Sequence, residues 1–403
     1  MVAPAELQAR IQSDIEALCE FDRGSASDGE RKAARWVASA FKEVGLEPEM
    51  EGFDFYPDYW NVWGAHMLGS LGAWLLLGRG GRSRRLLGTA VTSFLAASFW
   101  GDANARFYWL RRLFPARPSV NVLARLPNPH ASRLLVLSAH VDAAHSGLVF
   151  HPGVLGWVQR RYANGEMPPA LKLSFRGLVS LAAASAVRAI GLPRVLARTI
   201  ALPGVFISAA TAGLMADTRN RSVVPGANDD ASGVATVLAL ARELTAHPPK
   251  NLEVWFLVTG WEEGIEGGIH AFLERHHAEL GDRRPFFLNL EMLGSGRPVY
   301  SRAEGHVTTF QMQPEAISVV AEVAQESEFS AVEGVTLPAQ TDALAAHHYG
   351  FPAITVMSQA QEGETPHYHW PSDTPENIDG ASIERCYRYL QRIIQRLDAE
   401  GAS

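Results

Sequence analysis

Two adjacent carboxylates, Glu262 and Glu263, follow an apolar run of the chain. The run, residues 252–259, has the β-branched and aromatic composition of a buried strand, and it leads into the segment Trp261-Glu262-Glu263-Gly264. Glutamate is rarely buried unless a partner compensates its charge. The pair therefore predicts a bound cation, provided that other metal-binding residues follow other strands. A solvated acidic turn is the alternative interpretation of the pair taken alone.

Metal-binding side chains do occur at other predicted strand ends. With Glu263 they form a set of two imidazoles and three carboxylates: His140, Asp229, Glu263, Glu291 and His369. This composition suits zinc. Two zinc ions about 3.5–4 Å apart need one ligand that reaches both, and a carboxylate has two oxygens with which to do so. We expect Asp229, in the glycine-flanked loop 225–233, to be that bridging ligand.

Two further acids have predicted roles beside the metal. Successive side chains diverge, so Glu262 does not share the metal with Glu263, and a free carboxylate beside a metal is the usual general base. Asp142 lies two residues beyond His140, on the same face of an extended segment, where it can accept the proton of the other imidazole nitrogen. Glu262 is thus the predicted base, and Asp142 is the residue predicted to orient His140.

The elements that carry these residues alternate between short apolar strands and amphipathic helices. We expect strands near residues 46–55, 119–126, 133–138, 252–259, 286–291 and 353–356, and helices near 5–19, 27–45, 234–244 and 381–399. This alternation predicts an α/β fold with a mainly parallel sheet. Sites in such folds gather outside the carboxyl ends of the strands, which is where the candidate ligands occur.

The composition excludes several classes of protein. A chain of 403 residues with 47% hydrophobic content can bury a large core. Its net charge of −7 gives no basic footprint, so we expect no nucleic-acid partner. Cys19 and Cys386 are too few for a cysteine-based zinc site. The segment 1–19 lacks a basic stretch followed by an apolar core, so we predict no cleavable signal peptide.

Two apolar regions interrupt the α/β pattern. The first, residues 61–118, is predicted to be an apolar hairpin insertion whose arms are joined by the basic segment 79–85. Each of its arms is shorter than the about 20 residues expected of a membrane-spanning helix. The second, residues 147–222, is predicted to be an apolar helical insertion with arginines between its apolar runs.

Two interpretations of these insertions stay open. One is a helical subdomain or an interface between two copies of the chain, and the other is a membrane-embedded or interfacial region; a lid over the site is compatible with both. Arginine-rich turns beside apolar arms would place cations at lipid headgroups. We therefore expect a membrane-associated protein that contacts lipid through residues 61–101 and 171–216, with a cytoplasmic location and a homo-oligomer as alternatives.

Taken in order, these motifs resemble the M28 family of zinc peptidases, which are aminopeptidases and carboxypeptidases. The resemblance covers about residues 5–55 and 119–399, and it rests on five segments: Ser138-Ala139-His140-Val141-Asp142, residues 226–233, Trp261-Glu262-Glu263-Gly264, residues 289–294 and residues 368–374. It implies one peptidase domain over residues 1–403, apart from the insertions. It also implies a three-layer α/β/α fold of the zinc exopeptidase, phosphorylase/hydrolase-like type, with a mixed, mainly parallel central sheet.

The same resemblance implies two zinc ions per chain. They would be held by two triads that share one residue: His140, Asp229 and Glu291 for one ion, and Asp229, Glu263 and His369 for the other. Tyr368 matches a family tyrosine whose hydroxyl stabilises the tetrahedral oxyanion. The implied reaction is hydrolysis of the N-terminal peptide bond of a peptide or aminoacyl substrate by a zinc-activated water, with Glu262 as the base.

The chain departs from the family pattern at three places. Glu291 stands where many members have Asp, Trp370 stands where Thr is common, and Asp142 and Asp229 are 229 − 142 = 87 residues apart, a longer connection than is usual. None of these removes a ligand, but each bears on the substrate preference. Two other functions fit the pattern: a single-zinc acyltransferase resembling glutaminyl cyclase, and a non-catalytic, membrane-linked interaction protein. Retention of all five ligands argues against the cyclase.

Overall fold

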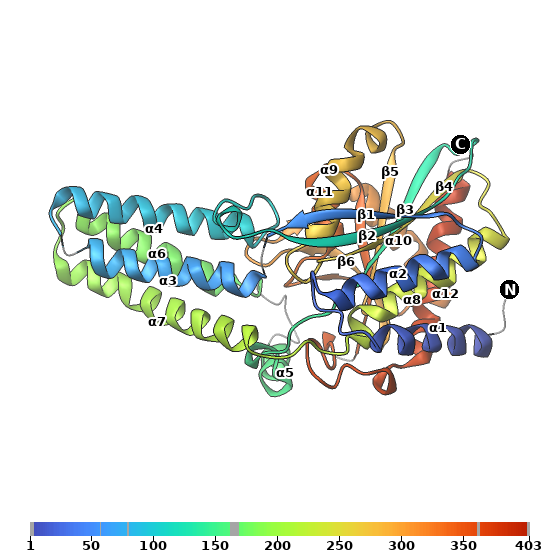
Figure 1. The fold of residues 1–403 in the computed structure, drawn as a ribbon, viewed down its shortest axis with the longest axis horizontal. Helices are drawn as coiled ribbons and strands as arrows, with labels where there is room; N and C mark the ends of the chain where they lie inside the picture. The colour runs from blue at the N-terminus through green and yellow to red at the C-terminus, as the bar shows by residue number, and fades with distance from the viewer. Residues whose placement is uncertain (1–3, 57, 79, 162–168, 361–362, 401–403) are drawn as a thin grey trace.

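The computed structural model describes residues 4–56, 58–78, 80–161, 169–360 and 363–400. Within these residues the chain forms one mixed sheet of nine strands with helices on both of its faces. A bundle of helices projects from one side of this α/β unit (Figure 1). The predicted α/β fold with helices on both sides of the sheet is confirmed.

The sheet is parallel at its centre, and the pairs toward its edges are antiparallel with one exception. Its order is β1 (Pro48–Phe55), β2 (Arg117–Leu126), β4 (Leu252–Thr259), β3 (Arg133–His140), β5 (Pro285–Glu291), β9 (Ala353–Gln359), β6 (Arg297–Glu304) and β7 (Phe310–Gln311), with β8 (Glu333–Thr336) also paired to β6, in the one parallel pair at this edge. Strands β4, β3, β5 and β9 run parallel to one another. Their carboxyl ends therefore meet at the same edge, and their residues are buried almost throughout.

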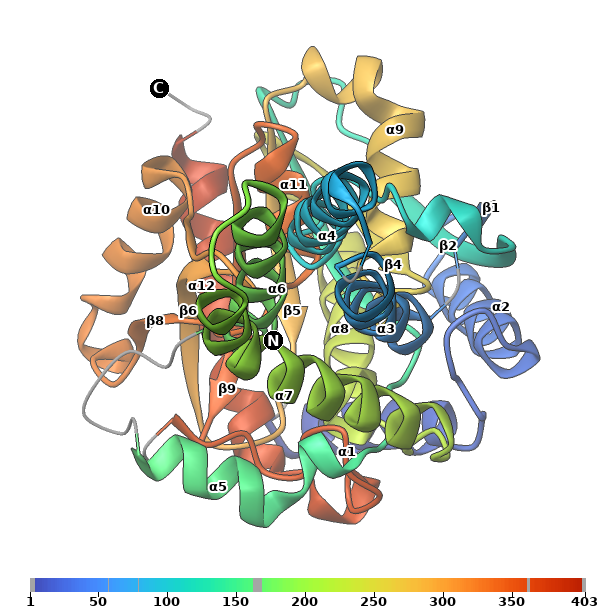
Figure 2. The same ribbon diagram turned by 90° about the vertical axis from the view of Figure 1, so that its left-hand side faces the viewer.

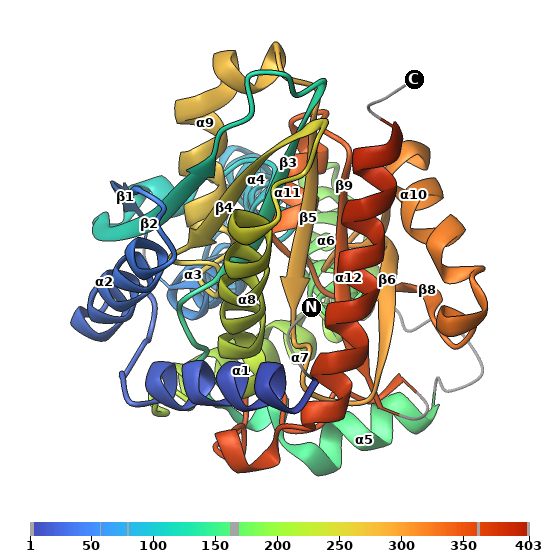
Figure 3. The same ribbon diagram turned by 90° about the vertical axis from the view of Figure 1, so that its right-hand side faces the viewer.

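Helices cover the two faces of the sheet. On one face lie α2 (Asp28–Glu43), α8 (Ser232–Ala246) and α12 (Gly380–Glu400), with α1 (Pro4–Cys19) packed across α8 and α12 and with α10 (Pro314–Ala324) beside α12 (Figure 3). On the other face lie α9 (Gly267–Gly281) and α11 (Asp342–His348). Their apolar faces and the central strands form one large core.

The two predicted insertions meet in space to form the projecting bundle. The first supplies α3 (Tyr59–Leu77) and α4 (Arg82–Asp102), and the second supplies α6 (Lys172–Ala189) and α7 (Arg194–Arg219). Within the described residues α4 packs on α6 and α3 packs on α7, so each hairpin faces the other (Figure 2). Along the chain, η1 (Arg111–Leu113) follows α4, and η2 (Leu148–Phe150) and α5 (Pro152–Arg161) precede α6. Two segments far apart in the sequence therefore build a single substructure.

Candidate metal centre

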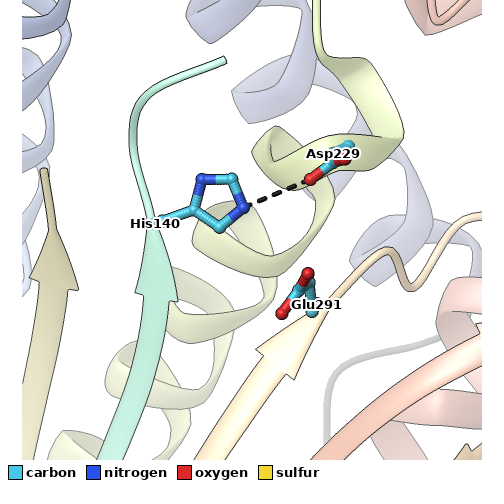
Figure 4. Close-up of side chains that lie close together, drawn as sticks. All are labelled: His140, Asp229 and Glu291. Carbon is cyan, nitrogen blue, oxygen red and sulfur yellow. Dashed lines mark hydrogen bonds and ion pairs between the residues drawn. The ribbon is translucent and has the colours of Figure 1, made fainter. Parts of the chain in front are cut away.

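The predicted ligand residues gather at the carboxyl edge of the central strands. His140 is the last residue of β3 and Glu291 the last of β5, while Glu263 stands four residues beyond the end of β4. Asp229 lies in the loop before α8, and it faces His140 and Glu291 in Figure 4. His369 comes from the loop after β9. All five are largely buried.

The five side chains form two groups that share Asp229. In the first group, the ligand atoms of His140, Asp229 and Glu291 all lie within 4.8 Å of one another. In the second, the same limit holds for Asp229, Glu263 and His369. One oxygen of Asp229, Oδ1, lies 3.2 Å from His140 Nε2, and the other, Oδ2, lies 3.0 Å from His369 Nε2. These are the two triads that the family resemblance implies.

The spacing of the donor atoms fits zinc. Two ligands about 2.0–2.1 Å from a tetrahedral zinc ion lie about 3.3 Å apart. His369 Nε2 is 3.0 Å from Asp229 Oδ2 and 3.2 Å from Glu263 Oε1. Apart from this ion-pair contact, the buried Glu263 Oε1 accepts no hydrogen bond from the described residues. A donor set of imidazole nitrogens and carboxylate oxygens at these separations is one that zinc prefers.

The charges of the centre favour a bound cation. Burial alone would lower the pKa of His369, but Glu263 and Asp229 beside it raise this pKa to about 10. Burial would raise the pKa of Asp229, yet hydrogen bonds with His140 and His369 hold it well below its usual range. Burial raises the pKa of Glu262 well above its usual value; His140 opposes this shift, and Glu291 and Glu263 add to it. These closely spaced carboxylates therefore stabilise a positive charge that lies among them.

Asp373 and Asp230 hold the loop that presents Asp229. The carboxylate of Asp373 accepts hydrogen bonds from the amides of Asn228, at 2.8 Å, and Asp229, at 3.1 Å. Asp230 Oδ1 accepts from the amides of Gly233 and Met292, each at 3.1 Å. Neither acid has a role predicted from the sequence. The signal for Asp373 was its place four residues beyond the candidate ligand His369, within the last family segment.

Asp142 connects the first predicted ligand to the pair of glutamates. Its Oδ1 accepts a hydrogen bond from the amide of Glu262 at 3.0 Å, and its Oδ2 accepts one from the amide of Glu263 at 3.1 Å. His140 Nδ1 lies 3.1 Å from the carbonyl oxygen of Asp142 and 3.5 Å from its Oδ1. Asp142 therefore contacts His140, at hydrogen-bond distance through its backbone carbonyl oxygen, and its carboxylate holds the loop that carries Glu262, a contact that the sequence did not indicate.

The loop with the two glutamates is also held from the foot of the bundle. Arg111 Nη1 donates a 2.8 Å hydrogen bond to the carbonyl oxygen of Gly264. The same guanidinium pairs with Asp102, the last residue of α4, through two contacts of 2.8 Å. Trp63 Nε1 of α3 donates to Asp102 at 2.8 Å. Arg111 and Asp102, which both belong to the first insertion, are fully buried. The hydrogen bond from Arg111 to Gly264 therefore joins this insertion to the loop that carries Glu262 and Glu263.

A pocket of about 360 Å³ adjoins the centre. Its walls come from the second insertion and from the loop after β9: Phe150, Pro152, Leu155, Gly156, Glu364, Thr365, Pro366, His367, Tyr368, Trp370 and Ser372. The ring centroid of Phe150 lies 4.4 Å from that of His369. Burial raises the pKa of Tyr368 well above its usual value and nearby carboxylates raise it further, so its hydroxyl keeps its proton and can donate a hydrogen bond.

Comparisons with known proteins point in the same direction as this geometry. Residues 215–394 match the model of Peptidase family M28. A vacuolar membrane protease of Schizophyllum commune is 43% identical over 83 residues, which are 20% of this chain and 9% of that protein. The chain thus matches less than a tenth of that relative's length.

Two solved structures share the fold over nearly the whole chain. BSAP, a zinc aminopeptidase from Bacillus subtilis, has a TM-score of 0.57 at 14% identity, covering 97% of this chain and 94% of its own. A glutaminyl cyclase from Fimbriiglobus ruber has a TM-score of 0.55 at 16% identity, covering 96% and 95%. At these identities the likeness shows the fold alone.

Proposed function

We propose that the chain, whose residues 215–394 match the model of peptidase family M28, is an aminopeptidase of this family with two zinc ions that hydrolyses the N-terminal bond of peptides or aminoacyl compounds. The observation that carries the proposal is the position of Asp229. Each of its oxygens lies close to a different histidine, and each of these histidines belongs to a different triad. A carboxylate placed in this way is suited to bridge two ions.

The residues around the centre suit the steps of peptide hydrolysis. Bound zinc would supply a Lewis acid that polarises the scissile carbonyl and lowers the pKa of a water molecule. Glu262, whose pKa burial raises, accepts the proton of the attacking water and returns it to the leaving amine. The hydroxyl of Tyr368 donates a hydrogen bond to the oxyanion. Asp142 keeps Glu262 in place through the Glu262 amide and contacts His140 Nδ1.

Metal content and hydrolysis of aminoacyl-p-nitroanilides test this proposal. We expect about two zinc ions per chain and an activity that a chelator abolishes and zinc restores. Glu262→Gln should keep the zinc and lose about 10²–10⁴-fold in kcat, the usual contribution of a general base. Glu274→Gln, an exposed substitution on α9, is the matched control. A Glu262→Gln enzyme that binds zinc and keeps full activity would refute the assignment of Glu262 as the general base. A wild-type chain that neither binds zinc nor hydrolyses these substrates would refute the proposed function.

The glutaminyl cyclase likeness makes acyl transfer with one zinc the second candidate. An assay with a peptide that begins with glutamine separates the two reactions. Cyclisation without release of free amino acids, in a chain with one zinc, would favour the cyclase. The geometry favours the peptidase, since both triads are complete.

We also propose that residues 61–101 and 171–216 contact a membrane. The supporting observations are the vacuolar membrane protease among the relatives and the apolar surface of the helices in these two segments. Association of two copies through the same surface is the competing arrangement.

A further inference from the structure

The bundle of α3, α4, α6 and α7 carries large apolar side chains on its outside. Leu76 and Phe206 are each 67% exposed. Others of this kind on the described bundle are Leu68, Leu75, Leu86, Leu87, Phe94, Leu173, Val179, Ile190, Leu192, Val195, Leu196 and Leu202. A bundle made for water has its apolar residues inside and polar ones outside. The outside of this one does not follow that pattern.

The inside of the bundle contains many small and hydroxyl-bearing residues. A Cβ atom on Gly204 of α7 would lie 2.7 Å from the carbonyl oxygen of Gly177 on α6, so these two helices touch through their glycines. Ser174 and Thr211 share a hydrogen bond of 3.0 Å between the same helices. Other buried members of this kind are Ser70, Ala73, Gly88, Thr92, Ser98, Ala184, Ser185, Ala197, Ala201 and Ser208. Small residues at helix contacts with apolar residues outside are the pattern of helices packed in lipid.

Apart from Asp102 and Asp217, at the ends of α4 and α7 near the sheet, the charged side chains of the described bundle are basic, and most of them lie at its far end. Residues 59–101 and 171–216 contain no Asp or Glu. The arginines at the far turns are Arg82, Arg84, Arg85, Arg188, Arg194 and Arg198. A hydrogen bond of 3.4 Å from Arg188 Nη2 to the carbonyl oxygen of Gly78 joins the ends of the two hairpins. Lys172 and Arg176 stand at the other end, near the sheet, where long basic side chains can reach headgroups.

The lengths of the helices match a bilayer. They have 19, 21, 18 and 26 residues, which at 1.5 Å per residue gives about 27–39 Å. The hydrocarbon core of a bilayer is about 30 Å thick. Among the described residues, α7 is the one helix that is long and apolar enough by itself to cross a membrane.

We infer that the bundle is embedded in a lipid bilayer as a unit, with its terminal arginines at the headgroups of the far leaflet and the α/β unit outside the near leaflet. This deepens the membrane contact that the proposed function includes. Lipid fits this surface better than a second copy does, because residues 59–101 and 171–216 of a second bundle offer apolar side chains but no carboxylate for the arginines. Anionic lipid phosphates supply that charge.

Carbonate extraction of membranes that contain the full chain tests the embedding. The test variant is Phe94→Glu/Phe206→Glu, which changes two outward side chains that are 44% and 67% exposed. Met50→Glu is the matched control, because Met50 is 43% exposed on β1 of the α/β unit. We expect the wild type and the control to stay in the membrane pellet after carbonate treatment. The membrane-bound fraction of the double variant should be at least tenfold smaller. Release of the wild type by carbonate, or a lipid-free dimer that the double variant dissociates, would overturn the inference.

Labelling of introduced cysteines tests the crossing independently of the charged variants. Ser83→Cys lies in the first turn of α4, at the far end, and Ser39→Cys lies on α2 of the α/β unit; both serines are exposed. In sealed proteoliposomes of the Cys19→Ser/Cys386→Ala chain, a membrane-impermeant maleimide should reach the two positions from opposite sides. Labelling from the same side would refute the crossing. Hydrolysis is measured in detergent, so an inactive chain that stays embedded would sink the proposed function alone.

Discussion

At the scale of residues, the centre depends on how firmly Asp229 is held. Its two oxygens can serve two ions only if the backbone keeps the carboxylate between His140 and His369. That backbone is held by Asp373, which accepts two amide hydrogen bonds and contributes no ligand atom of its own to the triads. Residues that hold a metal ligand in place by hydrogen bonds commonly affect metal affinity, because they fix the orientation of that ligand.

We therefore predict that Asp373→Asn weakens zinc binding by about 10–100-fold. An amide has a single acceptor oxygen, so one of the two backbone amides loses its partner. Competition with a chromogenic chelator measures the affinity. Glu376→Gln, an exposed change three residues away, should leave the affinity unaltered. Equal affinities for Asp373→Asn and wild type would mean that the loop holds its shape without Asp373.

Tyr368→Phe should lower kcat by about 10²–10³-fold with little change in KM, because one donor to the oxyanion is lost in the transition state alone. The ring contacts with Phe150 and His369 remain available to phenylalanine. Steady-state kinetics on an aminoacyl-p-nitroanilide provide the measurement. A rise in KM at constant kcat would instead assign Tyr368 to substrate binding.

Residue types and strand ends were enough to pick out the five side chains that the structure brings together. The sequence did not reveal Asp373, Asp230 or Arg111, because these side chains contact backbone amides or carbonyls. A contact with the backbone cannot be inferred from the types of the residues that make it. Which carboxylate meets which amide is decided by the approach of loops that lie far apart in the sequence.

At the scale of elements, Arg111 of the first insertion pairs with Asp102 and donates a hydrogen bond to Gly264 in the loop with Glu262. We predict that Arg111→Met lowers the free energy of unfolding by about 3–5 kcal/mol, because the Asp102 carboxylate is left buried without its partner. Denaturant unfolding measures this loss. The neighbouring Arg112 is exposed, so Arg112→Met should cost less than about 0.5 kcal/mol. Equal stabilities of the two variants would show that water or another group replaces Arg111.

A second link, between β1 and α9, gives the stability a dependence on pH. His276 Nε2 lies 2.7 Å from Glu51 Oε1, and this hydrogen bond raises the pKa of His276 above its usual value. Burial would raise the pKa of Glu51, but His276 lowers it. The glutamate's contribution is therefore present above about pH 4.3, and the histidine's is complete below about pH 6.5 and is lost as the pH rises through the folded pKa.

We predict that His276→Gln costs about 1–2 kcal/mol of unfolding free energy at pH 6 and clearly less at pH 9, because only a charged imidazole strengthens the bond to Glu51. Urea unfolding at the two pH values measures the difference. His130→Gln, at an exposed position, serves as the control. A cost that is the same at both pH values would assign His276 a packing role.

The predicted strands lie close to β1–β5 and β9, and the predicted helices lie close to α1, α2, α8 and α12. The hydrophobic pattern did not predict β6–β8 or α9–α11. The pairing of the two insertions does not follow from this pattern either. The apolar runs of 61–118 and 147–222 show that each forms helices, but small residues such as Gly177 and Gly204 carry no periodic signal strong enough to say which helix packs on which. The structure supplies that pairing, and with it the apolar outer surface.

At the scale of the whole molecule, metal binding and folding are linked. The site places three buried carboxylates in two groups with two histidines. At free zinc about 1,000-fold above its Kd, binding adds about 4 kcal/mol to the stability of the folded chain. We predict that chelation lowers Tm by several degrees in a thermal melt and that zinc restores it. Calcium, which takes six to eight oxygen ligands, should not restore Tm; recovery with calcium would contradict a site built for zinc.

The order in which the chain is made gives the bundle a further property. Helix α4 ends at residue 102 and α7 at residue 219, so 219 − 102 = 117 residues must be added before both partners of the first hairpin exist. At about 5–20 residues per second, this takes about 6–23 s. Throughout that interval the first hairpin lacks at least one of its two partner helices, since α6 ends at residue 189 and α7 at residue 219. Its early encounters during synthesis, with lipid or with a chaperone, therefore precede the completion of the enzyme to which it belongs.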